Sequence, residues 1–111
     1  MAKVTSTPIP EFVSRHISEL GSICQRHEVA RLELFGSAVT DSFNHETSDL
    51  DFLVEFEWTS HPSRWFYIYF DFRDALELLF GRSVDLVSYR TVRNPYLIAS
   101  INEQRTVLYA A

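Results

Sequence analysis

Residues 49–56 read Asp-Leu-Asp-Phe-Leu-Val-Glu-Phe and are the most informative segment of the sequence. Its apolar and β-prone residues are typical of a strand in the middle of a sheet. Asp49 and Asp51 stand two positions apart, so on a strand their side chains point to one face, roughly 6.6 Å apart along the chain. We therefore predict a central strand that presents two carboxylates on the same face.

A second acidic position lies in residues 83–88, which read Ser-Val-Asp-Leu-Val-Ser and predict another strand. If the two strands are neighbours, Asp85 joins Asp49 and Asp51 in one cluster. Buried unpaired carboxylates are costly, so three of them together make sense chiefly when a cation compensates their charge. Magnesium prefers such hard oxygen ligands, and paired metals about 3.5–4 Å apart serve nucleotidyl transfer. These three aspartates are our candidate catalytic and metal-binding residues.

Gly36 and Ser37 follow a third predicted strand, residues 31–35, and form a candidate phosphate-binding turn. A glycine lets the backbone approach a phosphate closely, and free amides in the following turn favour anions. The Ser37 hydroxyl can donate to a phosphate oxygen. Gly-Ser turns and Asp-x-Asp pairs are each common as plain turns or solvent-facing residues, so the combination carries the hypothesis.

The rest of the chain predicts a small α/β fold in one domain, with an N-terminal helix within residues 1–29 and a catalytic core in residues 30–111. The first helix is expected to start at Ser6-Thr7-Pro8 and to end near His27. A second is expected over Trp65–Phe80 with Gly81 at its end, then a short one from Asn94-Pro95 and an extended segment at residues 106–109.

Composition limits the functional classes. Of 111 residues, 46% are hydrophobic and 23% are charged, as in soluble globular proteins. The single cysteine, Cys24, allows no intrachain disulfide, and we expect it in the core of a cytoplasmic protein. No stretch is apolar enough for a secretory signal or a membrane span. The net charge of −5 argues against a nucleic-acid partner but not against a nucleotide whose phosphates a metal neutralises.

The motifs at residues 34–37, 48–55 and 81–87, in this order, resemble those of the DNA polymerase beta superfamily. They are most similar to the minimal nucleotidyltransferases, the MNT antitoxins that act beside HEPN-domain toxins. The resemblance covers about residues 30–110. It implies the minimal nucleotidyltransferase fold, a small mixed sheet flanked by helices.

The resemblance also implies an activity. Asp49 and Asp51 would bind two Mg2+ ions, and Asp85 would be a further ligand or help to activate the attacking hydroxyl. Gly36 and Ser37 would hold the phosphates of ATP. In the antitoxin branch the acceptor is a tyrosine of the HEPN toxin, which is adenylylated and silenced.

One departure from the family pattern concerns residues 38–41, which read Ala-Val-Thr-Asp where many relatives have Arg-x-Arg-Gly. A guanidinium that would neutralise triphosphate charge is therefore absent there. Arg64, Arg73 and Arg82 are candidates to replace it. The alternative is a weak or inactive enzyme, a binding module that neutralises the toxin by surface contact. Transfer to a small molecule is less favoured, because the chain has no second domain to bind one.

The aromatic-rich residues 58–72 exceed what one small core can bury. We expect about half of them in the core and the rest on a surface that contacts another chain, either the HEPN partner or a second copy in a homo-oligomer. The four histidines lack the spacing of metal ligands and are expected at the surface.

Overall fold

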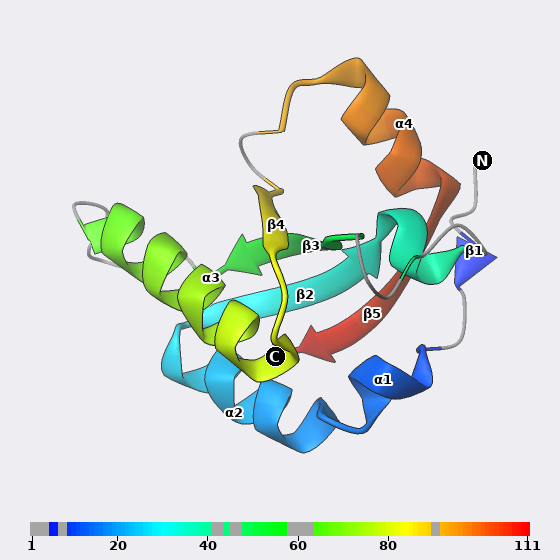
Figure 1. Ribbon diagram of the computed structural model, residues 1–111. Coiled ribbons are helices and arrows are strands. Elements are labelled where there is room, and N and C mark those ends of the chain that lie inside the picture. Colours follow the sequence, from blue (N-terminus) through cyan, green and yellow to red (C-terminus); the bar gives the residue numbers. More distant parts are fainter. Residues whose placement is uncertain (1–4, 7–8, 41–43, 45–47, 58–63, 90–91) are drawn as a thin grey trace.

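The computed structural model describes residues 5–6, 9–40, 44, 48–57, 64–89 and 92–111. They form a mixed sheet with helices on both faces (Figure 1), which confirms the predicted α/β class. In chain order the elements are β1 (Thr5–Ser6), α1 (Glu11–Ser14), α2 (Ile17–Arg26), β2 (Val29–Phe35), the 3-10 helix η1 (Gly36–Val39), β3 (Leu50–Phe56), α3 (Trp65–Phe80), β4 (Val84–Ser88), α4 (Pro95–Glu103) and β5 (Gln104–Ala110).

The strand order across the sheet is β1-β5-β2-β3-β4. β2 runs antiparallel to both β3 and β5, whereas β3 and β4 are parallel, as are β1 and β5. The sheet is therefore mixed, as the resemblance implies. β3 lies between β2 and β4, which confirms its prediction as an interior strand.

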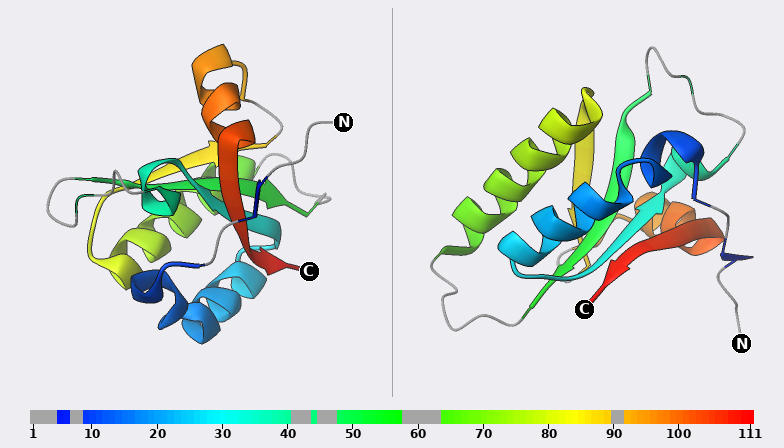
Figure 2. Two further views of the ribbon diagram at one scale, coloured as in Figure 1. Left: turned by 90° about the vertical axis from the view of Figure 1, so that its right-hand side faces the viewer. Right: turned by 90° about the horizontal axis from the view of Figure 1, so that it is seen from below.

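Alternate side chains of each strand point to opposite faces of the sheet, and helices cover both faces. Leu50, Phe52 and Val54 of β3 belong to the main core, which they form with α1, α2 and α3. Leu53, on the other face, packs with Phe35 of β2 and Ile101 of α4. Figure 2 shows α4 on one side of the sheet and α1, α2 and α3 on the opposite side. Asp51 shares the α4 face with Leu53.

The N-terminal segment differs from its prediction. Ser6 does not begin a helix but lies in β1, paired with Arg105 of β5, while Thr7 and Pro8 lie outside the described residues. Helix starts only at Glu11, after Pro10 in an extended conformation, and it breaks between α1 and α2. The predicted start was wrong because a cap pattern in the sequence cannot reveal a competing strand partner nearly a hundred residues away.

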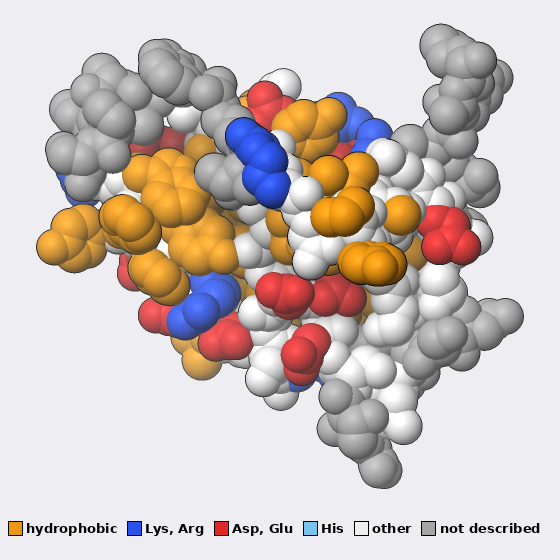
Figure 3. All heavy atoms as spheres, turned by 90° about the horizontal axis from the view of Figure 1, so that it is seen from above, with side chains coloured by type: hydrophobic (Ala, Val, Ile, Leu, Met, Phe, Trp, Pro, Cys, Tyr) orange, Lys and Arg blue, Asp and Glu red, His pale blue; other side chains and the backbone are white. Residues whose placement is uncertain are grey.

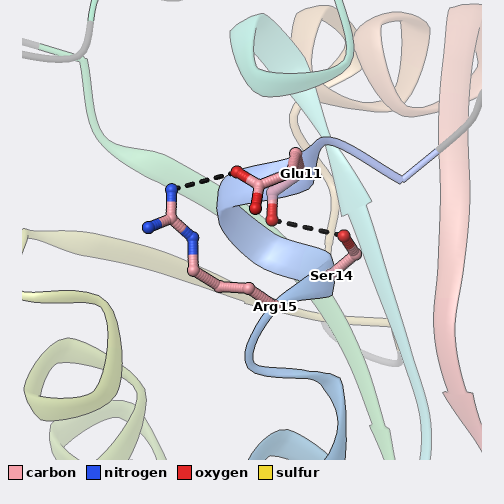
Figure 4. A network of polar contacts seen from close by, with 3 residues as sticks. All are labelled: Glu11, Ser14 and Arg15. Carbon is pink, nitrogen blue, oxygen red and sulfur yellow. Dashed lines mark hydrogen bonds and ion pairs between the residues drawn. The ribbon is translucent and has the colours of Figure 1, made fainter.

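Local polar contacts close the short helix α1 before the break. The Ser14 hydroxyl donates to the Glu11 carbonyl oxygen at 3.2 Å, and Arg15 Nη2 lies 3.1 Å from Glu11 Oε2 (Figure 4). Both charged side chains are mostly exposed, so this ion pair contributes little to stability. The network belongs to the fold and lies apart from the acidic strands.

The later elements follow their predictions closely. α3 spans Trp65–Phe80, and Gly81 ends it with a left-handed φ of 64°. The Asn94 side chain caps α4 by accepting from the amides of Tyr96 and Leu97. The terminal strand is longer than predicted, running from Gln104 to Ala110.

Cys24 is fully buried in α2, as predicted, and burial raises the pKa of its thiol to about 12. Among the described residues we find no helix with the length and hydropathy that crossing a bilayer requires.

Candidate functional site

Three strand ends meet at one edge of the sheet. β2 ends where β3 begins, because the two are antiparallel, and β4 begins beside β3 because those two are parallel. The register pairs Phe35 with Asp51 and Asp51 with Asp85. The last residues of β2 and the two aspartates therefore form one row across the sheet.

Asp51 and Asp85 point to the same face, because residues paired in register on adjacent strands share a side of the sheet. This is the α4 face, and acidic side chains gather at the centre of the molecule when it is viewed from that side (Figure 3). Asp49 is exposed and immediately precedes β3, one residue outside the strand that we predicted to contain it. The structure thus brings Asp85 next to Asp51, with Asp49 at the entry to the same strand.

Burial is the largest cause, and the nearby negative charges of Asp85 and Asp49 add to it; together they raise the pKa of the Asp51 carboxyl from 3.8 to about 6. Both causes disfavour the carboxylate form. A cation that binds between these groups would relieve both. The electrostatics of this edge therefore favour a positively charged ligand.

Gly36 contacts the same carboxylate. Its φ is 74°, in the left-handed region, and a Cβ at this position would lie 2.2 Å from Asp51 Oδ2. The carboxylate therefore packs against a backbone position that only glycine leaves open. The sequence predicts a phosphate contact for Gly36; the structure shows in addition that Gly36 leaves the space that the Asp51 carboxylate occupies.

The turn that follows Gly36 is the short helix η1. Ala38 and Val39 are buried in it, whereas Ser37 is only partly buried. The Thr40 hydroxyl donates to the Ser37 carbonyl oxygen at 3.0 Å, which closes the turn. Ser37 follows Gly36 directly and therefore lies close to the paired residues Asp51 and Asp85.

The described residues contain no preformed group of three acidic, histidine or cysteine side chains that would hold a metal on their own. The donor set still fits magnesium, because this ion keeps several waters and uses only one or two carboxylates together with substrate phosphates. Asp51 and Asp85 supply adjacent hard oxygens, and Asp49 lies within electrostatic reach.

Two small cavities flank this edge. One, about 220 Å3, is lined by Gly36, Ser37 and Thr40 together with residues of the α4 end. The other, about 260 Å3, lies between β4, the start of α3 and the start of α4. A larger hollow of about 620 Å3 lies over α2 and α3, lined by Arg26, His27, several α3 residues and Arg64, which directly precedes α3. None of these three cavities is lined by Asp49, Asp51 or Asp85, so the chemistry of the acidic side chains, and not a cavity volume, identifies the site.

Among the three candidate replacements for the missing guanidinium, Arg82 contacts the backbone next to Asp49, but its guanidinium lies 5.7 Å from the centroid of the Phe12 ring, on the α1 side of the sheet and not on the α4 side of Asp51 and Asp85. Its Nη1 donates to the Ser48 carbonyl oxygen at 3.5 Å, one residue before Asp49. Arg73 instead lies over the Phe70 ring. Arg64 lines the large hollow.

Tyr69 is a neighbour of the site that the sequence did not reveal. Its hydroxyl donates to the Leu86 carbonyl oxygen of β4. Burial raises the pKa of Tyr69, Arg73 lowers it and the charge of Asp85 raises it. The aromatic run containing Tyr69 indicated packing, and nothing in its spacing pointed to a contact with a strand residue seventeen positions later.

We predict that Gly36→Ala displaces the Asp51 carboxylate, so that the Asp51 pKa falls from about 6 toward 3.8. Gly81→Ala is the matched control, because Gly81 also has a positive φ but an added Cβ meets nothing within 4 Å. Both variants should lose about 1 kcal/mol of stability from the backbone conformation. NMR titration of the Asp51 carboxyl carbon distinguishes them, and equal pKa values in both variants would contradict the contact.

We also predict the pH dependence of Asp51→Asn. A carboxyl whose pKa is higher in the folded than in the unfolded chain costs stability once it ionises, so its contribution falls as pH rises from about 4 to about 6. The variant should gain about 1 kcal/mol over the wild type above pH 6, after allowance for solvent screening, and almost nothing below pH 4. Urea unfolding at pH 4, 5, 6 and 7 measures the difference. Parallel curves would contradict it.

Comparison with known proteins agrees with this geometry. Residues 17–108 match the family model described as "Nucleotidyltransferase domain". Two proteins of Methanocaldococcus jannaschii, both named "Putative protein adenylyltransferase", are 33% and 35% identical to the chain over 99 and 95 residues. The alignments cover 89% and 78% of the chain and 93% and 92% of these relatives.

Solved structures give the same result. A "putative minimal nucleotidyltransferase" is 35% identical and superposes with a TM-score of 0.63 over 82% of the chain and 87% of its own length. Two further structures share the fold. A toxin–antitoxin complex with AMP-PNP is 19% identical, with a TM-score of 0.59 over 86% of the chain and 73% of its own length. A tri-AMPylated Shewanella oneidensis HEPN toxin in complex with MNT antitoxin is 18% identical, with a TM-score of 0.59 over 88% of the chain and 72% of its own length. The chain belongs to the nucleotidyltransferase domain family, as a minimal nucleotidyltransferase of the DNA polymerase beta type.

Proposed function

We propose that this nucleotidyltransferase transfers AMP from ATP to a hydroxyl, that of a tyrosine, on a partner HEPN toxin, and so acts as its antitoxin in the cytoplasm. The observation that carries the proposal is the in-register pair of Asp51 and Asp85 beside Gly36. The relatives named as protein adenylyltransferases and the solved complexes of MNT antitoxins with HEPN toxins support the choice of reaction and partner.

In this proposal Asp49, Asp51 and Asp85 hold two Mg2+ ions, and Gly36 and Ser37 hold the phosphates. When bound, the metal would neutralise triphosphate charge that the carboxylates alone would repel. The cavity beside Gly36 and Ser37 adjoins η1, whose turn places Ser37 next to the acidic row.

The reaction is an in-line displacement at the α-phosphorus. The acceptor oxygen forms a bond to that phosphorus while the bond to the bridging oxygen of the β-phosphate breaks, and pyrophosphate leaves. The hydroxyl proton passes to the Asp85 carboxylate. Asp85 suits this role because it is exposed on β4, at the end of the strand order, where a protein acceptor can approach.

The test is incubation with Mg2+ and α-labelled ATP, with and without a HEPN partner. Label should appear on the partner, and Asp51→Asn or Asp85→Asn should reduce its rate at least about 100-fold, because the charges that organise the transition state are lost. Asp74→Asn is the matched control, since Asp74 is an exposed carboxylate on α3 that lines the large hollow. If the Asp51 and Asp85 variants label the partner at the wild-type rate, the proposed enzymatic role of these residues is wrong.

The rival function is that of a binding module that silences the toxin by contact alone. It is favoured by the turn after Ser37, where Ala38 and Val39 are buried in place of the charged residues of many relatives. Co-expression in cells separates the two functions. A blocking protein should still protect when Asp49, Asp51 and Asp85 are all changed to Asn, whereas an enzyme should not.

The start of α3 offers a surface for the partner. Phe66, Tyr67 and Phe70 are exposed by 67%, 77% and 44%, while Phe72 is buried. Figure 3 shows hydrophobic side chains gathered over this end of the helix. This division agrees with the expectation that about half of the aromatic run would leave the core; Trp58 lies outside the described residues. We propose that these three side chains contact the HEPN partner.

Replacing Phe66 and Tyr67 by Glu should weaken partner binding at least tenfold, because charges would have to be buried in the interface. Leu78→Glu is the control, since Leu78 is 87% exposed at the far end of the same helix. Isothermal titration calorimetry measures the affinity, and light scattering of the chain alone detects a homo-oligomer. Unchanged affinity would refute the partner surface, and a dimer broken only by the Glu pair would assign it to a second copy.

A further inference from the structure

The cavity of about 260 Å3 at the β4 edge has no role in the nucleotide contacts proposed above. Its walls come from the start of α3, from β4 and from the start of α4, with Trp65, Tyr69, Val87, Val92, Arg93 and Leu97 among the lining residues. Most of these surfaces are apolar or aromatic. The cavity therefore suits a ring or an aliphatic side chain better than a phosphate.

The cavity lies next to Asp85. Val87 is two residues further along β4, so its side chain points to the same face as Asp85, about 6.6 Å away along the strand. Tyr69 lines the cavity from α3. Its position is fixed because its hydroxyl donates to the carbonyl oxygen of Leu86, the residue between Asp85 and Val87. Asp85 does not itself line the cavity, so a side chain resting against Val87 would reach the Asp85 carboxylate by extending toward the beginning of β4.

The two small cavities lie at opposite ends of α4. The cavity beside Gly36 and Ser37 includes Ser100 and Glu103 near the end of the helix, whereas this one includes Leu97 near its start. The row from Gly36 through Asp51 to Asp85 lies between them. In-line transfer needs the nucleophile and the leaving group on opposite sides of the phosphorus, and this arrangement provides two such sides.

The size and walls indicate the occupant. At about 260 Å3 the cavity is smaller than the about 300–1,000 Å3 typical of whole-ligand pockets, so it fits a single side chain better than a nucleotide. Trp65 and Tyr69 are stacked with centroids 5.1 Å apart and an interplanar angle of 23°, which leaves an aromatic wall that favours another ring.

We infer that this cavity is the acceptor pocket, in which Trp65, Val87 and Leu97 receive the ring of a tyrosine of the partner protein with its hydroxyl directed at Asp85. The inference rests on the proposed function and names the residues that select the acceptor. The tyrosine oxygen then forms the bond to the α-phosphorus, pyrophosphate leaves, and the phenolic proton passes to Asp85.

The test uses N-acetyl-tyrosine amide as the probe and Trp65 fluorescence as the signal. The chain has two tryptophans, so a Trp58→Phe background makes Trp65 the reporter. We expect saturable binding in the millimolar range, weakened at least fivefold by Leu97→Phe, which narrows the cavity, and unchanged by Leu78→Ala. N-acetyl-serine amide should not bind, because it lacks the ring.

Transfer kinetics provide the second readout. Leu97→Phe and Trp65→Ala should raise KM for the tyrosine probe at least fivefold and leave the affinity for a non-hydrolysable ATP analogue unchanged. Absence of saturable binding would overturn the inference, and so would a loss of nucleotide affinity, because it would assign the cavity to the adenine base. Binding without transfer would leave the pocket standing and count against the proposed function instead.

Discussion

The contact between Gly36 and Asp51 is the constraint on which the site depends. The Asp51 carboxylate occupies the space that any other residue at position 36 would fill with a Cβ. There it is partly buried and close to the charges of Asp85 and Asp49, so its pKa rises to about 6. Such a placement lowers the stability of the protein near neutral pH, and a cation bound beside the carboxylate would offset this cost.

The mixed topology explains how three separate strands deliver their groups to one place. An antiparallel pair brings the end of β2 to the beginning of β3, and a parallel pair brings the beginning of β4 alongside. The parallel step requires a crossover, and α3 provides it. The buried side of α3 closes the main core with Phe72 and Leu76, so its other side is left exposed. The α3 connection therefore brings Asp85 beside Asp51 and also carries exposed aromatic side chains at its start.

The sequence predicted those features that are encoded by nearby residues. The bounds of α3 follow from an apolar run closed by Gly81, and the face shared by Asp51 and Asp85 follows from strand alternation once the strands are neighbours. The break before α2, the pairing of Ser6 with Arg105 and the place of Tyr69 beside β4 depend on distant partners. No local pattern encodes them. The contact between Gly36 and the Asp51 carboxylate could not be predicted from the sequence. A Gly-Ser turn indicates a flexible backbone but not which side chain packs against it.

The missing arginine after Ser37 has a structural counterpart. Ala38 is only 6% exposed in η1, so a guanidinium at this position would have to be buried or would have to open the turn. Arg82, two residues before β4, does not replace it: its Nη1 donates to the Ser48 carbonyl oxygen and its guanidinium lies over the Phe12 ring, on the α1 side of the sheet. In the proposed enzyme, neutralisation of the phosphate charge therefore depends mainly on the metal ions that the carboxylates would hold.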